Sequence, residues 1–163
     1  MKVLLALLAV LCTLVSPVEA GDTLPFLTID GETASPRTLS EAEFKALPRT
    51  AVRVKDRSGK EHSYEGVSLG FLLGLAGVPL KQNLKHGEVA KFLHAQGRDG
   101  YAAVFALPEF DRQDYLVADT ADGKALEPAT GPLQIVLPAE PRRSRWVKQL
   151  VLLRIVRSRE VRF

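Results

Sequence analysis

Two short stretches of the sequence hold side chains that could bind a small ligand. The first, "RDGY", places Arg98, Asp99 and Tyr101 around Gly100, between two apolar runs. A carboxylate accepts hydrogen bonds from ligand N–H groups, and an aromatic ring offers a stacking surface. The same residues are typical of a hairpin turn, since Gly97 and Gly100 tolerate positive φ and an Asp caps its own turn. The residues by themselves allow both interpretations.

The second stretch is "RRSRWVK", close to the C-terminus. If it forms a strand, alternation places Trp146, Lys148 and Leu150 on one face. Trp146 then stacks on a flat bicyclic ring while Lys148 binds it; the alternative is a tryptophan of the core or its rim. Arg142 and Arg143 are interpreted as loop charges.

Metal and thiol chemistry have little support in the sequence. The chain contains one cysteine, Cys12, and one methionine, Met1. Residues 21–163 therefore offer no disulfide, no thiolate ligand and no cysteine nucleophile. His62, His86 and His94 do not follow the spacing of a zinc site. We expect no bound metal.

The first 20 residues have the pattern of a secretory signal peptide. Lys2 precedes an apolar run over residues 3–15, followed by "SPVEA" and a cleavage site before Gly21. The run is shorter than the ~20 residues that span a bilayer, which argues against an uncleaved anchor. A lipoprotein signal is disfavoured because Cys12 lies inside the run. We expect a periplasmic protein with no stable membrane insertion after cleavage.

The positive charge is concentrated at the C-terminus. Residues 142–163 hold seven Arg and one Lys against the single Glu160. An exported protein meets little nucleic acid, so we expect no nucleic-acid partner. We interpret the following four residues as solvated charges that protect an edge strand from aggregation: Arg154, Arg157, Arg159 and Arg162.

The remaining sequence predicts one α+β domain, with mixed, mainly antiparallel strands and a few short helices. Ser40 and Glu43 form a capping-box pattern that begins a short helix. A buried helix is predicted where leucines recur at i, i+3 and i+4, over residues 67–80. We divide the chain into a signal peptide (1–20), an N-terminal extension (21–39) and the domain (40–163). Strands are predicted over residues 51–64 (a hairpin), 88–96, 101–108, 114–120, 125–138 and 146–156.

The order of these elements resembles the molybdopterin-binding domain of the sulfite oxidase family. The motifs "YEGVSLGFLLGLAGV", "RDGYAAVFALPEF", "YLVADTADGKALEPATGPLQIVLP" and "SRWVKQLVLLRI" follow one another from Tyr64 to Ile155. The resemblance implies a sulfite oxidase fold with a pterin cleft. It implies ligand contacts from the following residues: Arg98, Asp99, Tyr101, Glu109, Gln134, Arg145, Trp146 and Lys148.

The sequence departs from the family pattern at two positions. Family enzymes hold molybdenum through a cysteine thiolate, expected ahead of Tyr64, where "AVRVKDRSGKEHSY" has none. Gln134 replaces an arginine that makes bidentate anion contacts. The departures imply that the chain binds a reduced pterin in preference to a complete molybdopterin and is not an ordinary sulfite oxidase.

Two functions agree with this resemblance. One is an exported pterin sensor that regulates the periplasmic domain of a membrane-bound signalling protein, such as a cyclic-di-GMP cyclase or phosphodiesterase. The alternative is a molybdopterin-dependent oxidoreductase, or an accessory subunit of one. The fold alone does not decide between them.

Overall fold

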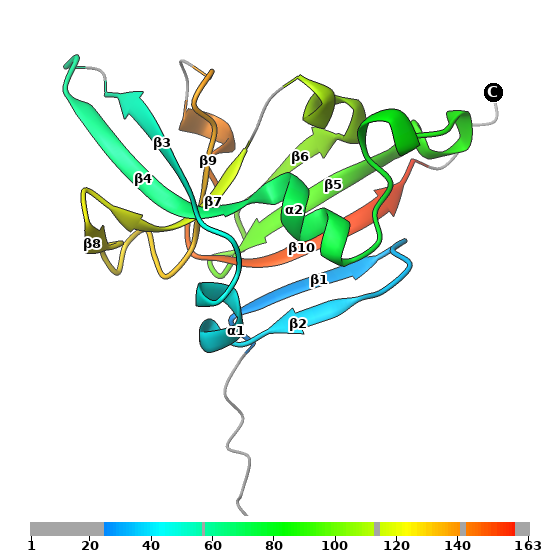
Figure 1. Ribbon diagram of the computed structural model, residues 1–163, viewed down its shortest axis with the longest axis horizontal. Coiled ribbons are helices and arrows are strands. Elements are labelled where there is room, and N and C mark those ends of the chain that lie inside the picture. Colours follow the sequence, from blue (N-terminus) through cyan, green and yellow to red (C-terminus); the bar gives the residue numbers. More distant parts are fainter. Residues whose placement is uncertain (1–24, 57, 113–114, 141–142, 159–163) are drawn as a thin grey trace, which may run out of the picture.

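Two five-stranded sheets form the framework of the protein in a computed structural model that describes residues 25–56, 58–112, 115–140 and 143–158 (Figure 1). The signal-peptide prediction lies outside the described residues. In the first sheet the strands follow one another in the order β2 (Arg37–Leu39), β1 (Leu27–Gly31), β10 (Leu150–Arg157), β5 (Lys91–Gly97) and β6 (Ala102–Ala106). In the second sheet the order is β3 (Thr50–Lys55), β4 (Glu61–Ser68), β7 (Leu116–Ala121) and β8 (Lys124–Ala125). The strand β9 (Gln134–Val136) also pairs with β7.

Most strand pairs are antiparallel, and β1 with β10 is parallel. The predicted α+β class with mixed, mainly antiparallel strands is therefore confirmed.

Both α-helices of the described residues are short: the first begins after Ser40 as predicted, and the second covers only Leu69–Leu75 of the predicted 67–80, because β4 continues to Ser68. The helix α1 (Glu41–Lys45) follows Ser40, whose hydroxyl accepts from the Glu43 N–H while the Glu43 carboxylate accepts from the Ser40 N–H. The helix α2 (Leu69–Leu75) is capped by the Ser68 hydroxyl. Among the described residues, no helix has the length and apolar character needed to cross a membrane. Four short 3-10 helices complete the helical elements: η1 (Lys81–Asn83), η2 (His86–Glu88), η3 (Leu107–Asp111) and η4 (Arg143–Arg145).

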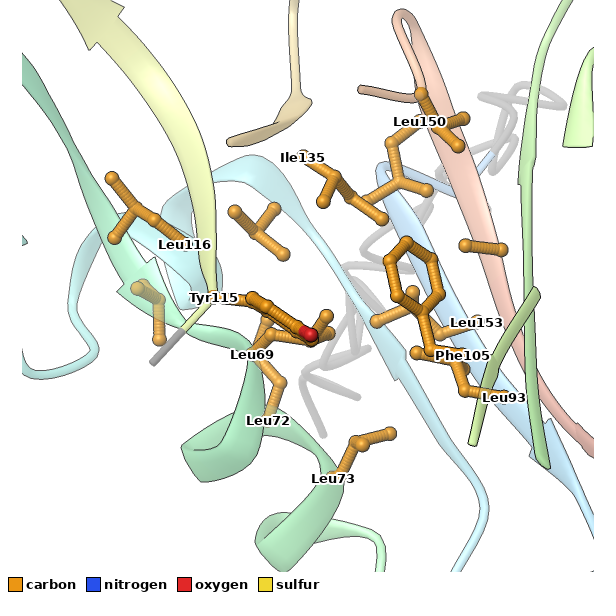
Figure 2. Close-up of a cluster of buried hydrophobic side chains, with 14 of the residues drawn as sticks. Leu69, Leu72, Leu73, Leu93, Phe105, Tyr115, Leu116, Ile135, Leu150 and Leu153 are labelled. Carbon is orange, nitrogen blue, oxygen red and sulfur yellow. The ribbon is translucent and has the colours of Figure 1, made fainter. Parts of the chain in front are cut away.

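Side chains from α2 and both sheets meet in one hydrophobic core. Leu69, Leu72 and Leu73 of α2 are fully buried, and Figure 2 shows them in a cluster with Leu93 and Phe105 of the first sheet. Burial of each leucine contributes about 1.5–3 kcal/mol. The predicted helical spacing therefore describes the buried face of α2, and this face holds the helix against the strands.

The prediction that the last strand is an edge strand is wrong. The strand β10 lies in the centre of the first sheet, between β1 and β5, so both of its edges are hydrogen-bonded. Arg154 forms a bidentate pair with Asp30, with two nitrogen–oxygen distances of 2.7 Å, and Arg157 pairs with Glu32 at 3.0 Å. Arg159 and Arg162 lie outside the described residues.

The N-terminal extension of the sequence analysis contains two strands of the first sheet. The strand β1 pairs with β10 through Thr28 and Leu152 and the residues that follow, and β2 pairs with β1. Asp30 on β1 therefore meets Arg154 across 124 residues of sequence. The segment is part of the same packed unit as the rest of the described chain.

Candidate functional site

An open cleft of about 1170 Å³ lies beside the second sheet. Its walls come from β4, the β7–β8 turn, the loop before β9 and the segment after η4. We name it the Trp146 cleft. Its aromatic, charged and amide lining residues are the following: His62, Tyr64, Asp122, Lys124, Glu127, Gln134, Arg143, Trp146 and Lys148.

Trp146 lies in the cleft wall with only 3% of its surface exposed. Tyr64 packs edge-on against the indole, with ring centroids 5.6 Å apart. The Arg143 guanidinium covers the ring at 4.6 Å from the centroid. Among the described residues, the buried indole Nε1 has no hydrogen-bond partner. The low exposure agrees with the alternative, a tryptophan of the core or its rim, and stacking of a ligand on the covered face requires that the Arg143 guanidinium move away.

Lys148 lines the same cleft as Trp146, although the segment between them is not a strand. The strand β10 begins only at Leu150, and Gln149 has a φ of 46° that interrupts an extended chain. The Val147 carbonyl accepts from the Ile135 N–H at 2.9 Å. This bond fixes Val147 in the core and leaves its two neighbours on the cleft side.

The cleft carries more positive than negative charge. Three cations, Lys124, Arg143 and Lys148, line it together with Asp122 and Glu127. Within the described part of the chain, none of the three cations forms an ion pair. Their charges are therefore available to an anionic group of a ligand.

Gln134 is the buried polar group of the cleft. It begins β9, where it pairs with Ala118 of β7, and is 6% exposed. Its amide both donates and accepts hydrogen bonds, so it suits a ligand edge that does the same. The predicted site residue thus lines the same cleft as Trp146 and Lys148.

His62 is held between two carboxylates at the rim of the cleft. Its Nδ1 lies 2.7 Å from the Asp122 carboxylate and its Nε2 lies 3.3 Å from Asp56. Asp122, which has a positive φ of 49°, also accepts from the Ser63 N–H. The Asp122 carboxylate makes the largest contribution to raising the pKa of His62 above its ordinary value, and the Asp56 carboxylate raises it further. When it is protonated, the imidazole adds a positive charge to the cleft.

We expect Asp122→Asn to lower the pKa of His62, because the largest contribution to its elevation is removed. Since the folded-state pKa is raised, the charged imidazole stabilises the fold below about pH 6.5, and this stabilisation is lost as the pH rises through the folded-state pKa. An NMR titration of the His62 ring protons measures both pKa values. Glu61→Gln, on the same strand, is the control. A His62 pKa at or below 6.5 in the parent protein would contradict the assignment.

The "RDGY" stretch forms the β5–β6 turn behind the cleft wall. The Asp99 carboxylate accepts from the Tyr101 N–H at 3.0 Å, so it caps its own turn. The Tyr101 hydroxyl donates to the Ser144 carbonyl, and the Arg98 N–H donates to the Gln149 carbonyl at 2.9 Å. None of these three predicted ligand residues is among the residues that line the cleft. Tyr101 contacts the backbone of the lining residue Ser144, Arg98 contacts the backbone of Gln149, and Asp99 contacts its own turn.

Arg145 and Glu109 also contact each other instead of the cleft. The Arg145 guanidinium lies 2.8 Å from the Glu109 carboxylate and forms a second ion pair with Glu140. It also stacks over Phe105 at 4.9 Å. These contacts hold Arg145 of η4, and neither Arg145 nor Glu109 is among the residues that line the Trp146 cleft. Their predicted ligand contacts stay predictions.

Tyr115 completes this ion-pair cluster. Its hydroxyl donates to the Glu109 carboxylate at 2.9 Å. Burial is the main cause that raises the pKa of Tyr115 to about 12, and this hydrogen bond adds to it. Burial raises the pKa of Glu109, but hydrogen bonds from Arg145, the Ala106 N–H and Tyr115 outweigh it and leave that pKa below its ordinary value. The carboxylate is ionised at neutral pH, so the cluster stays intact.

Sequence reasoning missed two features of the cleft. It treated Arg143 as a loop charge, and it considered His62 only as one of three histidines that lack the spacing of a zinc site. No local pattern joins His62 to Asp122, because pairing of β4 with β7 brings them together. In the described residues, no group of three His, Cys, Asp or Glu side chains is arranged to hold a metal ion.

Comparison with known proteins identifies the family and the fold of the chain. The family profile described as "Oxidoreductase molybdopterin binding domain" matches residues 23–163. Among solved structures, the sulfane dehydrogenase SoxCD from Paracoccus pantotrophus is similar, with a TM-score of 0.64 and 23% sequence identity. The alignment covers 79% of this chain and 37% of that chain, so this chain spans little more than a third of the neighbour. A search of the curated proteins gave no match.

Proposed function

Because the chain belongs to the oxidoreductase molybdopterin-binding domain family, we propose that it binds a pterin-type cofactor in the Trp146 cleft. One observation carries this proposal: a single cleft combines the buried Gln134 amide with cations that pair with no other described residue. A pterin presents N–H donors and carbonyl and ring-nitrogen acceptors. Gln134 complements both kinds of group, and Lys148 donates to an acceptor.

The residues of the cleft fit the organic part of a molybdopterin and not its metal. An oxo-molybdenum centre takes a soft thiolate from the protein. The chain has one cysteine, Cys12, which lies outside the described residues. His62 and Asp56, two other groups that could ligate a metal, form a hydrogen bond with each other. We therefore assign the cleft a pterin and derive no reaction through molybdenum.

Two measurements on the full chain test this proposal. Because Trp146 is the single tryptophan, its fluorescence reports directly on the cleft. Titration with 6-hydroxymethylpterin is expected to change this emission with saturation at one ligand per chain. Elemental analysis of the purified protein is expected to find molybdenum far below one atom per chain. A flat titration would refute pterin binding, and stoichiometric molybdenum would refute the metal-free assignment.

Two roles for the bound pterin remain candidates. The family and the similarity to SoxCD favour a pterin-binding domain of an oxidoreductase or of its accessory subunit. The lack of a thiolate in residues 21–163 favours a metal-free pterin sensor that regulates a membrane-bound signalling protein, such as a cyclic-di-GMP enzyme, through its periplasmic domain. Deletion of the chain should change cyclic-di-GMP levels in the second case only. Both roles include export, which cell fractionation tests.

A further inference from the structure

We propose that Arg143 selects planar ligands that carry a negative charge. In the free protein its guanidinium covers Trp146. In the complex the ligand ring takes the place of the guanidinium on the indole, and Arg143 pairs with an anionic substituent of that ligand. This inference rests on the proposed pterin function and adds the charge class of the ligand.

Two arginines of η4 are held in different ways. Arg145 is fixed by ion pairs to Glu109 and Glu140 and by its stacking over Phe105. Arg143 is exposed. Among the described residues its guanidinium forms no ion pair, and it is held only by the cation–π contact with Trp146. Such a contact is weak at an exposed site. A ligand therefore displaces Arg143 at little cost, while Arg145 keeps the backbone of η4 in place.

The surface under Arg143 is suited to a flat heterocycle. The indole offers a face for offset stacking once the guanidinium has moved away. Lys148 lines the same cleft. The displaced guanidinium then makes a bidentate pair with a carboxylate or phosphate of the ligand.

A first experiment tests the covering role without any ligand. Acrylamide quenching of the single tryptophan measures the access of solvent to the indole. Arg143→Ala is expected to raise the quenching constant at least about twofold, and Arg143→Lys to raise it in part, because a lysine lacks the planar group that stacks. Arg53→Ala, on the exposed side of β3, is the matched control and should leave quenching unchanged. Equal quenching in Arg143→Ala and the parent protein would overturn the covering role.

A second experiment compares two pterins that differ in charge. In the parent protein, pterin-6-carboxylate is expected to bind about tenfold more tightly than neutral 6-hydroxymethylpterin, because a charged hydrogen bond is added. Arg143→Ala should abolish this preference. It should also improve binding of the neutral pterin about two- to fivefold, because no cation–π contact has to be broken. The two ligands thus respond to one substitution in opposite directions.

The outcomes separate this inference from the proposed function. If both pterins bind and their affinity ratio is the same in Arg143→Ala as in the parent protein, the selective role of Arg143 is wrong and pterin binding stands. If neither pterin binds the parent protein, the pterin function and the selectivity are both wrong. Thermal melting of each variant confirms that the fold is retained before affinities are compared.

Discussion

We expect Gly97→Ala to lower the free energy of unfolding by about 1–3 kcal/mol and to weaken ligand binding. A Cβ at this position would lie 2.3 Å from the Lys148 carbonyl oxygen and 3.0 Å from the Asp99 carboxylate. The backbone of the cleft wall has to move to accept it, because a carbonyl oxygen cannot rotate away as a side chain does. Urea denaturation and a pterin titration measure the two effects.

Gly74→Ala provides the control for this substitution. Gly74 lies in α2, and a Cβ there would meet nothing within 4 Å. Alanine is a better helix former than glycine, so this variant should be neutral or more stable by about 0.5–1 kcal/mol. If Gly97→Ala were as stable as Gly74→Ala, the close approach of the β5–β6 turn to the cleft wall would be wrong.

The second large effect is expected for Lys148→Ala, which should weaken binding of pterin-6-carboxylate by about 10- to 100-fold. Loss of a hydrogen bond to a charged group costs about 1.5–3 kcal/mol. Lys148 is exposed and forms no ion pair within the described residues, so thermal stability should not change. Fluorescence titration of Trp146 gives the affinity, and thermal melting gives the stability.

Asp99→Asn distinguishes the cleft from the turn behind it. The Asp99 carboxylate caps the Tyr101 N–H, and an asparagine side chain makes the same contact. We therefore expect an affinity and a melting temperature close to those of the parent protein. A loss of affinity as large as that of Lys148→Ala would show that Asp99 contacts the ligand, as the family resemblance implies.

Local sequence was sufficient for the elements whose cause is local. The capping box of Ser40 and Glu43 begins α1 because both partners lie within one turn. Leucine spacing identified the buried face of α2 because a helix repeats every 3.6 residues. The "RDGY" turn follows from its Gly and Asp residues. The order of motifs also identified the family. Of the eight ligand residues that the resemblance implies, Trp146, Lys148 and Gln134 line the cleft, and the other five do not.

Several contacts near the cleft depend on how strands that are far apart in the chain pair with one another. Parallel pairing with β1 makes β10 a central strand, and an apolar strand with spaced arginines does not reveal this, since it looks the same at an edge. His62 acquires its two carboxylates only because β4 pairs with β7 and folds back on β3. The sequence by itself determined which side chains were present and where the capped helix, the buried helix face and the "RDGY" turn form. Only the tertiary structure decided that Arg145 is fixed by carboxylates while Arg143 covers Trp146, because neighbouring side chains of a short turn point toward different partners.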